Sequence, residues 1–451
     1  MRTWFRSRTR LERLFLIACC VAIPAELIVK AVCHTSAYGD FNVHRDFGHR
    51  FLAGLPLYQD TLCFNYMPIS AMYYAPLAMA PEAVASPLRT STGLACLGLS
   101  LAWLGAMVAG RARPGSWRGL TVAALAVLLT LQYVMRDLDD GGPHLIYLAM
   151  IVGSMALVRR GREGLAAVGF GLAIALKMTP GLLLPFFAWK RQWKLAGLSA
   201  AAAAAWIVLP AVWMGPASWW VHQRQWNRMA LSVFSDRPDA LREANEVRVQ
   251  NQALRPAVVR LLVAYPAGHP LKLDNPADVA VLDLKPATAN RLASIAGLGL
   301  LAAVAWWSRR PFAGPDDLAW PAEMAAVLIL IPLLSPVTWL QHLVFAVPAA
   351  YLLVAGHRSF RPLGRRALVT LGVYGLLAVG LNRGLVGRDL SLLLFSYHVH
   401  TLALLMLLGL LMANCPGSGQ DPVDRADDRR SGRKPLTMHR ESLISWASKS
   451  R

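Results

Sequence analysis

Charged residues are scarce in this 451-residue chain, at 16% against the ~25% that is typical of soluble proteins. Hydrophobic residues make up 55% of the chain, and the charges lie in the gaps between long apolar stretches. A soluble enzyme is therefore excluded. The net charge of +20 does not indicate a nucleic-acid partner either, because excess Arg in a membrane protein marks cytoplasmic loops and contact with anionic lipid. The sequence predicts an all-α, multi-pass membrane protein.

Cysteine is also scarce. Six cysteines scattered over the chain are too few for a disulfide framework, which excludes a small secreted scaffold. Only Cys33 and Cys63 bracket a predicted outer loop, so a bridge between these two stays open.

Long apolar stretches are what the chain has in abundance. A helix needs about 20 mostly apolar residues to cross a membrane, and about ten stretches meet or approach that length: 11–33, 90–110, 119–135, 144–158, 195–213, 291–307, 318–334, 340–354, 366–381 and 391–412. The first is too long for a signal peptide and has no small-residue cleavage site, so we expect it to be an uncleaved helix. Two further stretches are interrupted: 66–81 by prolines, and 164–189 by a break at 177–181.

The distribution of basic residues predicts the sidedness of the membrane domain. Basic clusters lie in 2–13, 111–118, 159–162, 190–194, 309–310, 358–366 and the tail after 414. All of them fall on the cytoplasmic side only if neither interrupted stretch makes a net crossing. We therefore expect 66–81 to be re-entrant or tilted, and 164–189 to be a hairpin that enters and leaves from the cytoplasm. This gives a membrane domain over 1–413, with outer loops at 34–65 and 214–290, and a disordered cytoplasmic tail over 414–451. Both termini would then lie on the cytoplasmic side of the inner membrane.

The first outer loop carries the most informative carboxylate. Its aromatic residues predict an amphipathic helix at the membrane surface that begins near Asp40 and ends by Gly54 and Pro56. Asp40 could simply cap this helix, or it could be a general base held at the surface. Asp46 lies six residues along the same helix and is the alternative base.

A second predicted outer loop, 136–144, is acidic. Asp137, Asp139, Asp140 and His144 could together hold a divalent cation, but a solvated turn explains the Gly-Gly-Pro sequence equally well, and we favour it. No cofactor is required by the sequence, and the need for a divalent metal is left open.

Two ionisable residues lie inside apolar stretches. Lys177 is about 13 residues from the cytoplasmic start of its segment, which is ~20 Å of helix, so it is a functional candidate; snorkelling to the surface is the alternative. His342 lies just inside a span next to Gln341, after a turn that contains Ser335.

Several short motifs, in this order, resemble glycosyltransferase family 87. They are Asp-Phe-Asn-Val-His-Arg at 40–45, Phe-Leu-Ala-Gly-Leu-Pro-Leu-Tyr at 51–58, Phe-Asn-Tyr-Met-Pro at 64–68, Leu-Lys-Met-Thr-Pro at 176–180, Asn-Gln-Ala-Leu at 251–254 and Ser-Pro-Val-Thr-Trp-Leu-Gln-His at 335–342. The resemblance covers roughly residues 10–413. Members of this family are polyprenol-phosphate-mannose-dependent mannosyltransferases with the membrane-embedded C-type fold.

The resemblance implies a hexosyltransferase that takes mannose, or another hexose, from a polyprenyl-phosphate donor. The acceptor would be lipid-linked or a glycan at the outer face, and the first-loop carboxylate, Asp40, would be the catalytic base. Transfer with inversion needs one such base, together with groups that stabilise the departing phosphate. Lys177, Arg255, Arg260 and His342 are the candidates for that second role.

The chain departs from the family pattern at two places. The family usually has two adjacent His after Ser-Pro-x-x-Trp, whereas Gln341 stands at the first of these positions here, and the Gly-Gln-x-Asn expected before His144 is absent. Two other interpretations therefore stay open. A transporter or lipid flippase would also place Lys177 and His342 near a central cavity, and a pseudoenzyme would explain Gln341.

Overall fold

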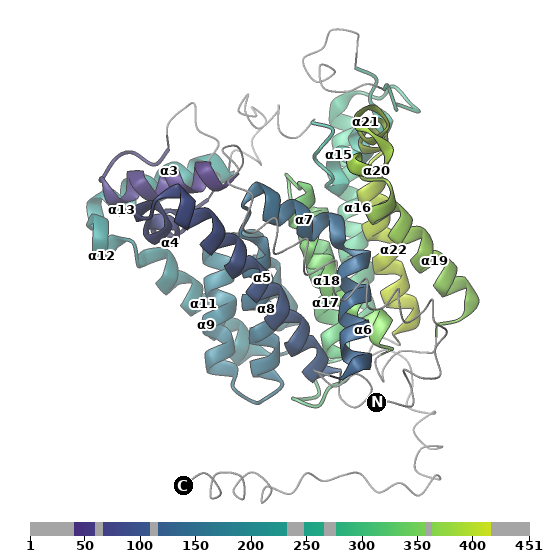
Figure 1. The fold of residues 1–451 in the computed structure, drawn as a ribbon, viewed down its shortest axis with the longest axis horizontal. Helices are drawn as coiled ribbons and strands as arrows, with labels where there is room; N and C mark the ends of the chain where they lie inside the picture. The colour runs from purple at the N-terminus through teal and green to yellow at the C-terminus, as the bar shows by residue number, and fades with distance from the viewer. Residues whose placement is uncertain are drawn as a thin grey trace, which may run out of the picture. The chain divides into compact units, whose positions relative to one another are not determined.

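The computed structural model describes residues 40–58, 66–108, 116–231, 248–265, 277–356 and 363–415, and this part of the chain is helical and contains no strand (Figure 1). The chain divides into one compact unit, Met1–Ser418, and a second, Gly419–Arg451. The second unit, the predicted span 11–33 and the cysteines 33 and 63 lie outside the described residues.

The helices appear in the order that the apolar stretches predict. They are α3 (Asp40–Leu52), α4 (Pro68–Met79), α5 (Glu82–Met107), α6 (Trp117–Leu129), α7 (Leu131–Asp140), α8 (His144–Val158), α9 (Glu163–Leu176), η1 (Thr179–Leu182), α10 (Leu183–Trp189), α11 (Trp193–Val208), α12 (Ala211–Met214), α13 (Pro216–Leu231), α15 (Leu254–Leu262), α16 (Pro286–Trp307), α17 (Trp320–Leu334), η4 (Leu340–Ala346), α18 (Val347–Ala355), α19 (Arg365–Gly375), η5 (Leu376–Gly380), α20 (Arg383–Val386), α21 (Arg388–Ser396) and α22 (Val399–Asn414).

Fewer helices than expected are long enough to cross a membrane on their own. Within the described residues, α5, α16 and the segment Trp193–Met214 are long and apolar enough to cross a membrane. The number rises from three to five if each of two bent helix pairs is counted as one span. The expected count of about ten spans is therefore not reached. Several of the remaining predicted spans are present as apolar helices of 10 to 17 residues, including α8, α17 and the segment Leu340–Ala355.

Two predicted spans are bent rather than continuous. The predicted span 119–135 ends as α6 at Leu129, and α7 leaves it at an angle of 71°. Between them the Thr130 hydroxyl donates to the carbonyl of Ala126, which competes with the regular helical ladder. The predicted span 391–412 is bent by 59° between α21 and α22, where His398 has the left-handed φ of 52°. Sequence hydropathy detects neither bend, because each helix pair, taken together, is apolar enough for a membrane span.

The interrupted stretch 164–189 forms the hairpin that the basic clusters predict. α9 runs to Leu176, the chain reverses through η1, and α10 returns to Trp189. Lys194 and Glu163 approach to 3.9 Å, so both ends of the hairpin lie at the same end of the bundle. The tip lies against α4, since Ser70 donates a hydrogen bond of 2.8 Å to the carbonyl of Leu176. Lys177 is therefore carried at the hairpin tip.

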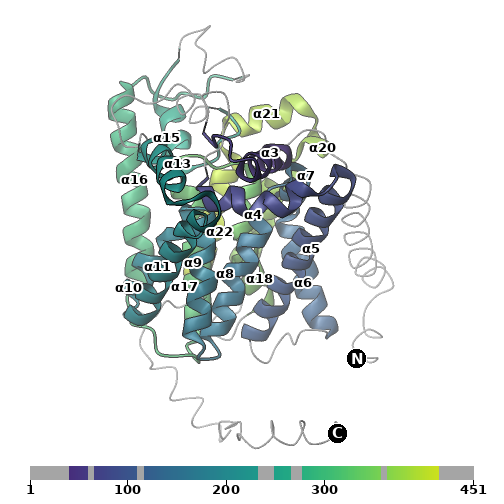
Figure 2. The same ribbon diagram turned by 90° about the vertical axis from the view of Figure 1, so that its left-hand side faces the viewer.

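Three of the predicted basic clusters meet at one end of the helix bundle, which we call the basic end. Arg159 donates to the carbonyl of Asp317 at 2.5 Å, and Lys190 donates to the carbonyls of Ser308 and Arg310. The opposite end, which we call the α3 end, carries α3, α7, α13, α15 and α21 (Figures 1 and 2). The first motif, at the start of α3, and these three basic clusters thus lie at opposite ends.

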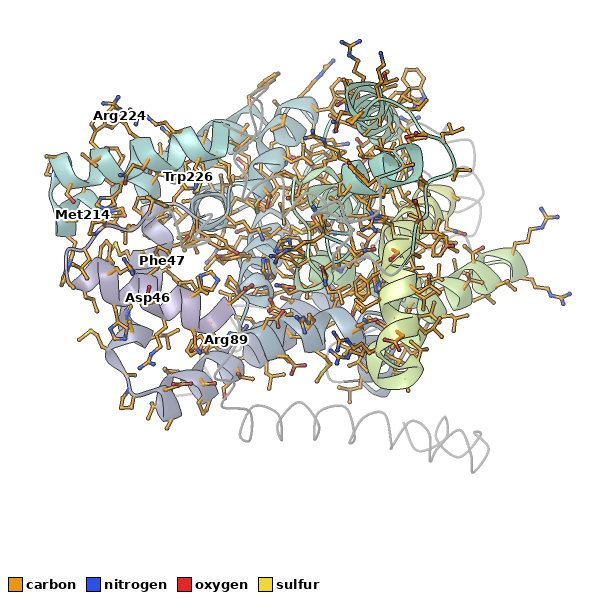
Figure 3. All side chains as sticks on the ribbon, turned by 90° about the horizontal axis from the view of Figure 1, so that it is seen from above. Asp46, Phe47, Arg89, Met214, Arg224 and Trp226 are labelled. Atoms are coloured by element: carbon orange, nitrogen blue, oxygen red, sulfur yellow. The ribbon has the colours of Figure 1, made fainter. Side chains whose placement is uncertain are left out.

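Helix α3 lies flat across its end of the bundle. Phe47 and Phe51 are buried against α4, and Met214 of α12 packs on the same cluster. The view onto this end shows Phe47 and Met214 side by side (Figure 3). The predicted amphipathic helix is therefore confirmed, and its buried face fixes where its first residue lies.

A buried ion pair joins the α10–α11 turn to α17 at the basic end. Lys190 Nζ lies 2.7 Å from Glu323 Oε2, and both side chains are fully buried. A buried charge that loses its partner is strongly destabilising, whereas an exposed pair contributes little.

We expect Glu323→Gln to lower the free energy of unfolding by about 3–5 kcal/mol, because it leaves the Lys190 charge buried without a counter-charge. Thermal unfolding of the purified protein in a neutral detergent measures the change. The matched control is Lys194→Gln, which removes a largely exposed cation 3.9 Å from Glu163 and should cost under about 1 kcal/mol. Equal losses in the two variants would contradict a structural role for the buried pair.

Candidate active site

Asp40 is the first residue of α3, and its carboxylate is directed toward the body of the bundle rather than toward its own helix. Oδ2 accepts a hydrogen bond of 3.0 Å from Nε2 of Gln341, a residue 301 positions further along the chain. Within the described residues, no N–H of α3 donates to this carboxylate, so the capping role that the sequence left open receives no support from the geometry. The contact joins the first motif of the sequence to the last.

Burial shapes the ionisation of Asp40. The pKa of its carboxyl is raised above the usual 3.8, first because burial disfavours the charged form and also because of the nearby Asp137 carboxylate. The hydrogen bond from Gln341 and the charges of Lys177 and Arg136 lower it again. The result is a carboxylate that binds a proton more readily than an exposed Asp and has an ammonium group within electrostatic range. Such a group suits a general base.

A chain of three side chains holds Lys177. Its Nζ donates to Nε2 of His144 at 2.6 Å, and Nδ1 of His144 lies 2.9 Å from Oδ1 of Asp137. An ammonium can only donate, so Nε2 accepts and Nδ1 carries the proton that is donated to Asp137. The carboxylate thereby fixes the tautomer of His144 and the place of the Lys177 ammonium.

The carboxylate of Asp137 is fully buried and held from all sides. The backbone N–H groups of His144 and Leu145 donate to its two oxygens at 3.1 Å each, and Arg89 NH2 lies 3.8 Å from Oδ2. Arg89 also donates to the carbonyls of Asp137, Leu138 and Gly142. The solvated turn that we favoured for this segment is therefore wrong at Asp137: residues up to Asp140 continue α7, and this side chain faces the interior.

Glycines make the turn after α7 possible. Gly141 has the left-handed φ of 71°, which favours glycine. A Cβ at Gly142 would lie 2.5 Å from Oδ1 of Asp137 and 3.0 Å from Nδ1 of His144. Any side chain at Gly142 would thus displace the carboxylate and imidazole that hold Lys177.

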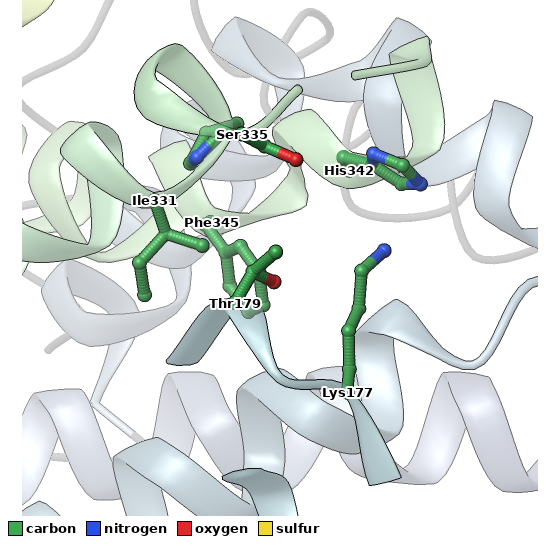
Figure 4. Close-up of a pocket in the computed structure, with 7 residues that line it drawn as sticks. Lys177, Thr179, Ile331, Ser335, His342 and Phe345 are labelled. Atoms are coloured by element: carbon green, nitrogen blue, oxygen red, sulfur yellow. The ribbon is translucent and has the colours of Figure 1, made fainter. Parts of the chain in front are cut away.

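His342 completes the group from η4. Its ring centroid lies 4.4 Å from that of His144, and the N–H of Trp339 donates to its Nδ1 at 3.3 Å. A small pocket is lined by Lys177, Thr179, Ser335 and His342 together with the apolar Ile331, Pro332 and Phe345 (Figure 4). In the close-up, the Lys177 ammonium and the His342 ring face the same space from different segments.

The structure does not bring the other proposed site residues to this group. Asp46 accepts a 2.8 Å hydrogen bond from Arg50 on the exposed side of α3, which weakens its case as the alternative base. Arg255 donates to Asn290 at 3.0 Å. Arg260 is buried on α15 and, within the described residues, makes no hydrogen bond to Asp40 or Lys177.

The acidic residues of α7 do not converge on a common point. Asp140 pairs with Arg136 at 2.7 Å, Asp137 is enclosed as described above, and Asp139 is partly buried. Within the described ranges, no group of three or more His, Cys, Asp or Glu side chains could hold a metal ion. The weak metal hypothesis for Asp137, Asp139 and Asp140 therefore gains no support from the geometry.

Sequence reasoning missed two members of the site. Gln341 was noted as a polar neighbour of His342 and as a departure from a family pattern, but not as the hydrogen-bond donor to Asp40 that it is. Arg89 lies in the first third of α5, just before the predicted span 90–110, where its charge alone could have drawn attention to it. His144 was considered only as a metal ligand.

The motif Asn251–Gln252 supports the turn that carries Gln341. Asn251 donates to the carbonyl of Pro336 at 3.0 Å and accepts from the N–H of Thr338 at 2.9 Å. These contacts do not place Gln252 against a substrate, because its backbone N–H donates a hydrogen bond of 2.7 Å to the carbonyl of Thr338 in the same turn. The Asn251–Gln252 motif therefore has a structural role: it supports the turn that carries Gln341.

Comparisons with known proteins identify the family of this chain. The model of glycosyltransferase family 87 matches residues 64–336. A polyprenol-phosphate-mannose-dependent alpha-(1-2)-phosphatidylinositol mannoside mannosyltransferase from Mycolicibacterium smegmatis is 24% identical over 341 residues, covering 68% of each chain. No solved structure matches the chain. Because the family model covers more than half of the sequence, including Lys177 and the Asp137–His144 turn, the chain belongs to glycosyltransferase family 87.

Proposed function

We propose that this membrane glycosyltransferase moves a hexose, mannose being the first to test, from a polyprenyl-phosphate sugar to a lipid-linked acceptor, with inversion at the anomeric carbon. The relative described above is named for a polyprenol-phosphate-mannose donor and a phosphatidylinositol mannoside acceptor, and these are the first substrates to try.

The observation that carries the proposal is one half-buried carboxylate within electrostatic range of one ammonium at the α3 end. Asp40 is held by Gln341, and the charge of Lys177 acts on it. A glycosidase needs two carboxyl groups that reach the sugar, but the second carboxylate here, Asp137, is enclosed by His144, Leu145 and Arg89. A single available base fits direct transfer to an acceptor hydroxyl.

The proposed step balances without an added reactant. The acceptor oxygen forms a bond to the anomeric carbon while the bond from that carbon to the phosphate oxygen breaks. Asp40 takes the proton of the hydroxyl, and the electron pair leaves on the polyprenyl phosphate. Lys177 would then face the growing negative charge, which is the usual way in which a site stabilises a leaving phosphate.

Asp137 and His144 serve this step by holding Lys177. A flexible ammonium loses entropy when it is placed, and the chain through His144 to Asp137 fixes it in advance. In this proposal the cation at the phosphate is a side chain, so the mechanism requires no metal.

Three features support action at the outer face of the cytoplasmic membrane. The basic clusters 159–162, 190–194 and 309–310 gather away from the site, as the positive-inside rule expects of a cytoplasmic end. Exposed Trp193 and Trp306 mark that end, and exposed Trp213 and Trp220 mark the α3 end; Trp is enriched at both membrane surfaces. The 20 residues from Trp193 to Trp213 correspond to about 30 Å of helix, which matches the hydrocarbon core.

Neither alternative interpretation is favoured. Family membership supports transfer rather than transport. The pseudoenzyme interpretation rested on Gln341, but the amide at that position still donates a hydrogen bond to Asp40, as a His could.

Asp40→Asn should lower sugar transfer by about 10²–10⁴, because the amide keeps the shape but cannot accept the proton. Transfer of radiolabelled mannose from polyprenyl-phosphate mannose, in membranes that contain the variant, measures the effect. Asp46→Asn is the matched control and should keep near-normal transfer, since Asp46 pairs with Arg50 on the exposed face. If Asp46→Asn is inactive while Asp40→Asn is active, the two residues have been assigned the wrong way round.

Gln341→Leu should move the acid limb of the pH–rate profile to higher pH. The amide stabilises the charged carboxylate and lowers its pKa. Its removal raises the pKa of Asp40 further, so the base becomes protonated, and activity is lost, at a higher pH than in the unchanged protein. Gln341→His retains a donor and is the control. An unchanged or downward-shifted limb for Gln341→Leu would refute the assignment of Asp40 as the titrating base.

A reporter fused after Met214 should be found outside, and one fused after Arg162 inside, because these residues lie at the α3 end and the basic end. A periplasmic and a cytoplasmic reporter fused at each position measure this. Both fusions reading on the same side would remove the basis for an outer-face site.

A further inference from the structure

A second polar cluster lies at the α3 end, at the bend between α21 and α22. Both ring nitrogens of His398 lack a hydrogen-bond partner within the described residues, although the side chain is 3% exposed. The equally buried Arg260 lies on α15, and Gln252, two residues before this helix, hydrogen-bonds to Phe395 and Thr401 on either side of His398. A buried polar atom without a partner is costly, and a left-handed φ at a residue other than Gly adds strain. Such features persist where function requires them.

The cluster also contains the start of a long helix. His398 occupies the N-cap position of α22, a helix of 16 residues. The first N–H groups of a helix have no partner within it and carry partial positive charge, which makes them a binding site for anions. Imidazole, guanidinium and helix N-terminus thus offer donors and positive charge at one place.

This cluster is distinct from the proposed donor site in its hydrogen bonds. Within the described residues, Asp40 is held by Gln341 and Lys177 by His144, and neither Arg260 nor His398 takes part in these bonds. The donor has one sugar-linked phosphate, and that phosphate must lie at the reacting carbon beside Asp40. A second cationic centre therefore cannot bind the same phosphate during transfer.

Hydrogen bonds nevertheless link the surroundings of the Arg260–His398 cluster to those of the Asp40–Lys177 site. The side-chain amide of Gln252 donates to the carbonyl of Phe395 at 3.1 Å, and the backbone carbonyl of Gln252 accepts from the Thr401 hydroxyl at 2.8 Å. The Asn251–Gln252 motif therefore makes hydrogen bonds on both sides of the bend between α21 and α22. Tyr133 Oη lies 3.4 Å from Nδ1 of His400, and on α7 Tyr133 is one turn, about 6 Å, from Asp137. A single lipid with a sugar headgroup could reach both centres.

We propose that Arg260, His398 and the first turn of α22 form a second phosphate-binding subsite, which holds a phosphate ester of the acceptor lipid. The inference rests on the proposed function for the identity of the acceptor, but the anion site itself does not depend on transfer. His398 donates a ring N–H and Arg260 donates guanidinium N–H groups to the phosphate oxygens.

Kinetics with two acceptors test the assignment to the acceptor. In membranes with the full-length protein, Arg260→Gln and His398→Asn should raise KM for phosphatidylinositol mannoside about tenfold or more, the change expected when a charged hydrogen bond is lost. Asn tolerates the left-handed conformation. KM for polyprenyl-phosphate mannose, and KM for a mannosyl dialkylglycerol without phosphate, should stay unchanged. Arg291→Gln removes an exposed cation of α16 and is the control for net charge.

The same experiment can overturn the assignment. A raised KM for the donor would place the subsite on the donor instead. An equal rise with the acceptor that lacks phosphate would make the cluster a structural brace, and an unchanged KM for phosphatidylinositol mannoside would leave no phosphate subsite there.

A binding measurement separates this inference from the proposed function. Inorganic phosphate, exchanged for chloride at constant ionic strength, should raise the Tm of the full-length Lys177→Ala protein in neutral detergent, because a ligand that binds the folded state stabilises it. The rise should vanish in the Lys177→Ala/Arg260→Gln protein. A rise in the Lys177→Ala protein, together with no sugar transfer by the unsubstituted protein, would overturn the proposed function and keep the site. No rise, or an equal rise in both variants, would overturn the site.

Discussion

The site depends on the cost of placing charge in apolar surroundings. Lys177 stands at the tip of a hairpin within an apolar bundle, and an ammonium there is unfavourable unless it is partnered. His144 and Asp137 provide the partners through two short hydrogen bonds. Asp137 is in turn stabilised by Arg89 and by two backbone N–H groups. Each charge at this end is thus supported by another, and the removal of one leaves its neighbours unbalanced.

Asp40 is the member of this group whose carboxylate remains available. It receives one side-chain hydrogen bond within the described residues, from Gln341, whereas Asp137 is enclosed by donors. Two carboxylates near the same ammonium thereby acquire different roles from their surroundings, one structural and one reactive. This division is typical of sites that tune like groups by environment.

The sequence predicted much of this arrangement and missed specific parts for physical reasons. The hairpin at 164–189 followed from counting basic clusters, and the amphipathic helix from Phe47 and Phe51, because both depend on patterns local to the chain. The bends at Thr130 and His398 were missed, since hydropathy does not report backbone direction. Asp137 was placed in a solvated turn because its partners, Arg89 and Lys177, are distant in sequence, and only packing brings them together.

The hairpin formed by α9 and α10 also sets how far Lys177 lies from the basic end of the bundle. Its base is fixed at the basic end, where Lys194 lies near Glu163, and its tip presents Lys177 to the opposite end. The 14 residues of α9 therefore fix the distance from the base of the hairpin to its tip at about 21 Å. One residue added to or removed from α9 would move the tip by about 1.5 Å and turn it by about 100°. The length of this helix is consequently a constraint on the chemistry, so that substitutions along its lipid-facing side are tolerated far more readily than any change in the number of its residues.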